Sequence, residues 1–134
     1  MNPEEDFDIS IALETLEHAP PDLVNGYLRK MALHTRDCIF ISVPNEKGIV
    51  FLAKWLSKRL YFGYASDYSA KELFYATIGR MDKIMRNEHK GFDYIALINE
   101  IRAYFEIIEV SSIPFGFLPP YLGYGIGIVA KPLH

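Results

Sequence analysis

The chain has 134 residues, half of them hydrophobic, including nine Phe, nine Tyr and one Trp, so it has enough apolar material for one packed core and does not belong to the disordered class. Its 14 Lys and Arg against 17 Asp and Glu give a net charge of −3, which provides no general attraction to nucleic acid. The single cysteine, Cys38, excludes an internal disulfide and a cysteine-only metal cage.

The first third of the chain predicts a strand, a helix and a second strand. Residues 7–13 form a short β-branched run typical of a buried strand. Prolines at 20 and 21, with Asp22 as the expected cap, predict a helix that carries one apolar stripe. Residues 38–43 predict a second buried strand, with Cys38 as a small buried side chain. A helical crossover between two apolar strands is typical of a parallel βαβ unit.

The middle of the chain predicts helices. Residues 48–64 are apolar on most sides, and residues 69–85 predict a helix capped by Ser69. A polar hinge at 87–92 precedes a third expected helix at 93–104.

The last third predicts an antiparallel pair of strands, at 105–113 and 126–131, separated by a loop rich in proline and glycine. We therefore expect one α/β domain over 1–134, a mixed sheet with helices on its faces. The start of the chain has no signal-peptide pattern, and no uncharged apolar run is long enough to span a membrane, so we expect a cytoplasmic protein.

Several motifs along these elements resemble one known family. They are FDxxxxxExxEH at 7–18, SxPN at 42–45, EHKGF at 88–92 and GIVAK at 127–131. Together they resemble the C-terminal half of the class I S-adenosylmethionine-dependent methyltransferases, in particular the ubiquinone-pathway O-methyltransferases. The resemblance implies a partial Rossmann-like fold with a C-terminal antiparallel hairpin, in which residues 46–92 form a variable helical insert or lid.

The resemblance also implies a function, which is methyl transfer from S-adenosylmethionine to a small-molecule acceptor that we expect to be hydrophobic. The glycine-rich turn and the acidic ribose-binding residue of the family's N-terminal half have no counterpart in this sequence. The glycines at 123–127 lead into a strand rather than a helix, so they do not replace that turn. We therefore expect the cofactor to bind only when the missing half is supplied.

The candidate site residues follow the first strand, at the strand end where ligands bind in open α/β sheets. The resemblance places Leu13 and Glu14 against the cofactor, with core packing as the alternative for Leu13. On one helical turn, Glu14, Glu17 and His18 would lie on one side and could bind Mg²⁺, Mn²⁺ or Zn²⁺. Alternatively, His18 is the catalytic base, or Glu17 and His18 only bond to nearby backbone.

Two further interpretations concern partners. The segment around Trp55, with Lys54, Lys58 and Arg59, suits either a lid over the acceptor or a membrane surface, and we favour the lid. An aromatic wall for the acceptor would then be formed by Tyr61, Tyr64, Phe115, Phe117 and Tyr121.

A different class of function remains open beside methyl transfer. Without the missing half, the strand at 7–13 would present an open edge and an uncovered sheet face. The chain would then be a non-catalytic remnant or a subunit that associates with a partner chain or with itself, as a homo-oligomer, through that sheet.

Overall fold

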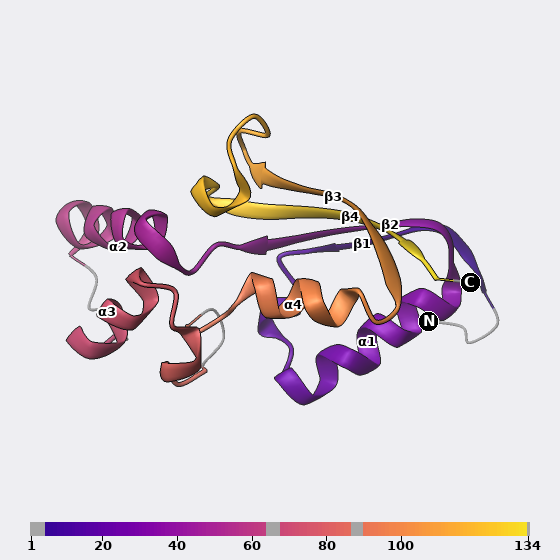
Figure 1. Ribbon diagram of the computed structural model, residues 1–134, viewed down its shortest axis with the longest axis horizontal. Helices are drawn as coiled ribbons and strands as arrows, with labels where there is room; N and C mark the ends of the chain where they lie inside the picture. Colours follow the sequence, from indigo (N-terminus) through magenta and orange to yellow (C-terminus); the bar gives the residue numbers. More distant parts are fainter. Residues whose placement is uncertain (1–4, 64–67, 87–89, 134) are drawn as a thin grey trace.

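The structure is a computed structural model that describes residues 5–63, 68–86 and 90–133 (Figure 1). Its framework is a four-stranded mixed sheet in the order β1-β2-β4-β3. The structure confirms the α/β class and the partial Rossmann-like arrangement expected from the sequence.

The strands run where β-branched residues are dense in the sequence. β1 (Phe7–Leu13) pairs in parallel with β2 (Thr35–Pro44), and β4 (Gly125–Pro132) lies antiparallel to β2 on one side and to β3 (Phe105–Ile113) on the other. The expected βαβ unit and the carboxyl-terminal antiparallel hairpin are both present.

Two helices cover one face of the sheet. α1 (Pro21–His34) and α4 (Tyr94–Ile101) lie together on one side of the strands (Figure 1), and a short 3₁₀ helix, η1 (Leu16–His18), precedes α1. Their apolar side chains and those of the central strands form the main core, which includes Val24, Leu28, Ile39, Ile41, Leu97, Ile101, Ile126 and Ile128.

Two other helices lie beyond the end of the sheet at which β2 finishes (Figure 1). α2 (Gly48–Phe62) and α3 (Ala70–Thr77), followed by the 3₁₀ helix η2 (Met81–Lys83), form a separate small core. This core consists of Phe51, Ala76, Met81 and Ile84, packed by Tyr68, Leu73 and Tyr75.

Several predicted helix boundaries were wrong. The single helix expected over 69–85 stops at Thr77, because Gly79 takes a left-handed conformation (φ 80°) that ends the helix, although the Ser69 cap is confirmed. α1 begins at Pro21, so Asp22 lies in its first turn rather than at the cap. α4 ends at Ile101.

The prediction that β1 is a buried strand was also wrong. Ile9, Ile11 and Leu13 are 50%, 64% and 61% exposed, and Phe40 beside them in β2 is 40% exposed. They lie on the sheet face opposite α1 and α4, because side chains alternate along a strand. Cys38, in register with Ile9, is partly exposed rather than buried.

The helices that the structure describes are too short or too polar to cross a membrane.

Candidate functional site

Three strands end at one edge of the sheet. β1, β2 and β3 run in the same direction, because β2 and β3 are both antiparallel to β4. The segment after Leu13, the turn after Pro44 and the loop after Ile113 therefore meet at the carboxyl edge, where open α/β sheets bind ligands.

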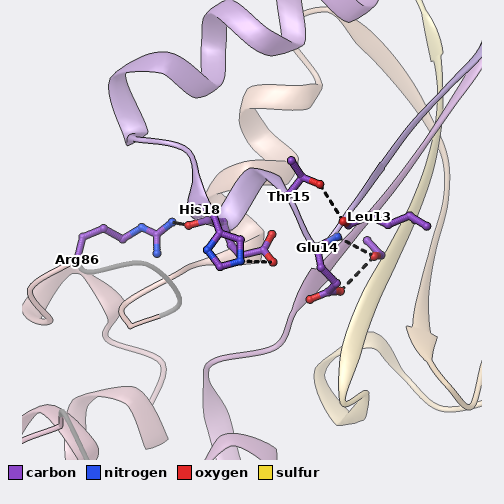
Figure 2. Close-up of polar contacts among 7 residues, drawn as sticks. Leu13, Glu14, Thr15, His18 and Arg86 are labelled. Carbon is purple, nitrogen blue, oxygen red and sulfur yellow. Dashed lines mark hydrogen bonds and ion pairs between the residues drawn. The ribbon is translucent and has the colours of Figure 1, made fainter.

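The end of β1 is fixed to β2 by hydrogen bonds (Figure 2). The amide of Glu14 donates to the Ser42 carbonyl (2.9 Å), the Ser42 hydroxyl donates to the Glu14 carboxylate (3.1 Å), and the Thr15 hydroxyl donates to the Leu13 carbonyl (2.8 Å). Glu14 has a φ of 46°, which is uncommon for a residue with a Cβ. The bonds of Glu14 to Ser42 hold it in this turn.

His18 lies away from the Glu14 carboxylate (Figure 2) and close to Glu17. Glu17 is buried, and its carboxylate is 3.7 Å from Nε2 of the half-exposed His18. The Arg86 guanidinium donates to the Glu17 carbonyl (2.6 Å), and burial lowers the pKa of Arg86. η1 is thus attached to the segment that follows η2.

The single helical turn expected over 14–18 does not form, since η1 begins only at Leu16 and Glu14 has left-handed backbone. The structure therefore brings Glu17 and His18 together but leaves Glu14 apart. In the described ranges no group of three His, Cys, Asp or Glu residues is placed to hold a metal ion. Metal binding and the base role of His18 stay predictions.

A buried asparagine connects β2 to the loop before β4. The Asn45 side-chain amide donates to the carbonyls of Tyr121 (3.2 Å) and Gly123 (2.9 Å). The Asn45 backbone N–H donates to the Tyr124 carbonyl (3.2 Å). Asn45 is fully buried, so these bonds replace water that its amide would otherwise need. They determine where η3 (Pro120–Leu122) lies.

Lys54 joins α2 to the same point. Its ammonium donates to the Asn45 carbonyl (2.8 Å) and lies 4.2 Å from the centre of the Tyr124 ring. Burial lowers the pKa of Lys54, while the negative charges of Glu46 and Glu14 act in the opposite direction. The connected residues Asn45, Lys54 and Tyr124 are called the Asn45–Lys54 link below.

An apolar pocket of about 480 Å³ lies beside this link. Val50 of α2 lines it, together with residues that come from the end of β3 and the loop after it: Ile113, Pro114, Phe115, Leu118, Leu122, Gly123 and Tyr124. The pocket therefore lies at the carboxyl edge, between α2 and the β3–β4 loop.

The expected aromatic wall forms only in part. Phe115 lines the pocket and lies 5.8 Å, ring to ring, from the strongly exposed Phe117. Tyr61 and Tyr121 are also exposed and do not line the pocket, and Tyr64 lies outside the described residues.

The glycines at 123–127 serve close backbone packing. A Cβ at Gly123 would lie 2.5 Å from the Ser112 Cβ, and one at Gly127 would lie 3.2 Å from the Ser111 hydroxyl. They open a β-strand, whereas a phosphate- or nucleotide-binding turn leads into a helix. The prediction that this stretch is not a cofactor cradle agrees with this packing.

The residues that the structure describes do not by themselves make a complete site for S-adenosylmethionine. The amide of Glu14 and the carbonyl of Leu13 are both bonded within the chain, and Leu13 projects from the uncovered face of the sheet. None of the described strands is followed by a glycine-rich turn and a helix. The contact of Leu13 and Glu14 with the cofactor stays a prediction.

The comparisons with known proteins show a fold. No family model and no curated protein matches the chain. Among solved structures, the PH0226 protein from Pyrococcus horikoshii OT3 is similar at a TM-score of 0.54 over 96% of this chain, with 10% sequence identity. The chain spans 56% of that protein's length. The likeness shows that the two chains share a fold and does not extend to activity.

Sequence reasoning missed the contacts that build the site. The roles of Asn45, Lys54 and Arg86 depend on partners 9 to 78 positions away. The signal available was an asparagine directly after a strand-ending proline, a residue type that commonly bonds loop backbone.

Proposed function

We propose that this chain is the acceptor-side half of an S-adenosylmethionine-dependent methyltransferase and that its apolar pocket binds a hydrophobic methyl acceptor. The observation that carries the proposal is the pocket's place at the carboxyl edge of a Rossmann-like sheet. The motifs at 7–18 and 42–45 support it, and the fold shared with PH0226 is consistent with it.

The pocket residues would act by positioning. An apolar acceptor between Val50 and Phe115 would be shielded from water and held in one orientation, which is the main task of the protein in an in-line displacement. The Asn45–Lys54 link keeps Tyr124 in the pocket wall. His18, on the same edge and beside Glu17, is our candidate for the base that takes the acceptor's proton.

The acceptor site is tested with naphthol, an apolar phenol, and NMR shift mapping. We expect naphthol to shift the signals of the pocket residues and a Leu118→Trp substitution to weaken its binding at least about tenfold, because the indole fills the pocket. Ile95→Trp, on the exposed side of α4, is the matched control and should leave binding unchanged. Shifts confined to other surfaces, or none, would show that the pocket is not the acceptor site.

The proposal that this chain is one half of a methyltransferase is tested by measuring cofactor binding to the chain alone. We expect no calorimetric heat when S-adenosylmethionine is added at millimolar concentration to the chain alone, because the described residues form only part of a site. Heat that fits a single site would show that the chain is not a half.

A non-catalytic subunit is the second candidate. The exposed apolar side chains of β1 favour it, since they form a surface suited to another polypeptide. Membrane contact by the α2 segment around Trp55 is the weaker option, and failure to co-sediment with anionic vesicles would exclude it.

A further inference from the structure

The outer side of β1 is an edge with backbone groups directed outward. β1 is a terminal strand of the sheet, and no other described strand pairs with its outer side. The Glu14 amide donates to β2, and N–H and C=O groups alternate in direction along a strand. The backbone groups of Ile9 and Ile11 therefore point away from β2, toward the open side.

Apolar side chains lie directly beside these backbone groups. Ile11 is in register with Phe40, and Phe40 with Val129, so the three side chains share the uncovered face of the sheet. Ile9 and Leu13 extend the same exposed row along β1. This set, Ile9, Ile11, Leu13, Phe40 and Val129, is called the β1 surface below.

The opposite edge of the sheet lacks this combination. β3 has an irregular register between Ile107 and Glu109, and it carries exposed carboxylates at Glu106 and Glu109. Such irregularities and charges are the usual protection of an edge strand against pairing. β1 carries neither over its last five residues, where the register with β2 is regular.

Acidic residues stand at both ends of the open strand. Asp6 and Asp8 lie at its start, where Arg36 comes within 3.5 Å and 4.0 Å of them, and Glu14 follows its last residue. Antiparallel pairing of two copies centred on Ser10 would set Asp6 opposite Glu14, and centring on Ile11 would set Asp8 opposite Glu14. Opposed like charges destabilise a strand pair, so this arrangement disfavours a second copy.

We infer that the β1 surface binds a separate polypeptide, which adds a strand of alternating apolar residues to the open edge and carries Lys or Arg at both ends of that strand. The basic ends would face Asp6, Asp8 and Glu14. The inference goes beyond the proposed function and holds whether or not the chain takes part in methyl transfer.

The test uses a synthetic peptide of alternating Val and Thr with two lysines at each end, followed by amide hydrogen exchange in NMR. We expect saturating peptide to slow exchange of the Ile9 and Ile11 amides at least about tenfold, because both become bonded. Ile11→Lys should abolish this protection, and Ile95→Lys, on the exposed side of α4, should preserve it.

A peptide with glutamates in place of the lysines is the control for charge, and it should bind at least about tenfold more weakly. Equal binding of the two peptides, or no protection at millimolar peptide, would overturn the inference. So would sedimentation of the chain alone as a dimer with Ile9 and Ile11 protected, which would identify a second copy as the occupant. Because neither naphthol nor cofactor is present, failure here leaves the pocket assignment intact.

Discussion

The two faces of the sheet differ although they are formed by the same strands. Ile39 and Ile41 are almost completely buried under α1 and α4, whereas Phe40, between them in sequence, is substantially exposed. β1 shows the same contrast, since Ala12 packs on the core and its neighbours Ile11 and Leu13 do not. The difference teaches that hydrophobic composition alone does not locate the core, because the positions of the helices decide which face is buried.

The contrast also separates stability from recognition. Burial of apolar area contributes about 25 cal/mol per Å², so the covered face supplies most of the free energy of folding. The uncovered face contributes little to the isolated chain and is free to contact another molecule. Substitutions on the two faces should therefore have effects of very different size.

The largest effect is expected on the covered face. Leu28→Ala should lower the free energy of unfolding by about 3 kcal/mol, because Leu28 is completely buried and its truncation leaves a cavity. Urea denaturation measures the change. Leu23→Ala, on the same helix but half-exposed, is the control and should cost less than about 1 kcal/mol. Equal losses would show that α1 does not pack as described.

The next effect concerns the carboxyl edge. Asn45→Ala should cost about 2 kcal/mol and weaken naphthol binding, because the carbonyls of Tyr121 and Gly123 lose their donor. The same denaturation and NMR titration measure both. Asn99→Ala, which removes an exposed bond to Arg102, serves as the control. A variant with unchanged stability and unchanged naphthol binding would show that Asn45 does not shape the pocket.

A smaller effect is expected in the small core outside the sheet. Ser69 and Glu72 form a capping box at the start of α3, so Ser69→Ala should cost about 1 kcal/mol, while Ser69→Asp retains most of the stability. Hydrogen exchange of the α3 amides shows the local loss. Identical exchange in both variants would contradict the cap's role.

The smallest effect is expected on the uncovered face. Ile11→Thr should change the free energy of unfolding by less than about 0.5 kcal/mol, because Ile11 is mostly exposed and Thr keeps the β-branch. Chemical denaturation of the original chain and of the Ile11→Thr variant, carried out in parallel, measures this change. A loss as large as that of Leu28→Ala would mean that the face is covered in solution.

The sequence was sufficient for the strands but not for their surroundings. β-branched runs located β1 and β3 because such residues favour extended backbone. A near-continuous apolar run such as 7–13 is equally compatible with burial on both faces, so it gave no sign that Ile11 is exposed. Recognising the uncovered face required the three-dimensional structure, which shows where the helices lie relative to the sheet.

The candidate site was predictable in position only. The rule that ligands bind at the carboxyl ends of parallel strands located residues 13–18 and 44–47 correctly at one edge. The grouping of Glu14 with His18 failed because it assumed helical spacing, and Glu14 instead adopts left-handed backbone bonded to Ser42. Backbone conformation at a single residue is set by such distant bonds, which no local pattern encodes.

The Asn45–Lys54 link has a mechanical consequence. Lys54 is anchored in α2, whereas Tyr124 and Gly123 belong to the β3–β4 loop, and all three meet at Asn45. A shift of α2 would therefore be transmitted to the loop through Asn45, and the shape of the pocket between them would change with it. α2 and the β3–β4 loop would therefore move together rather than independently.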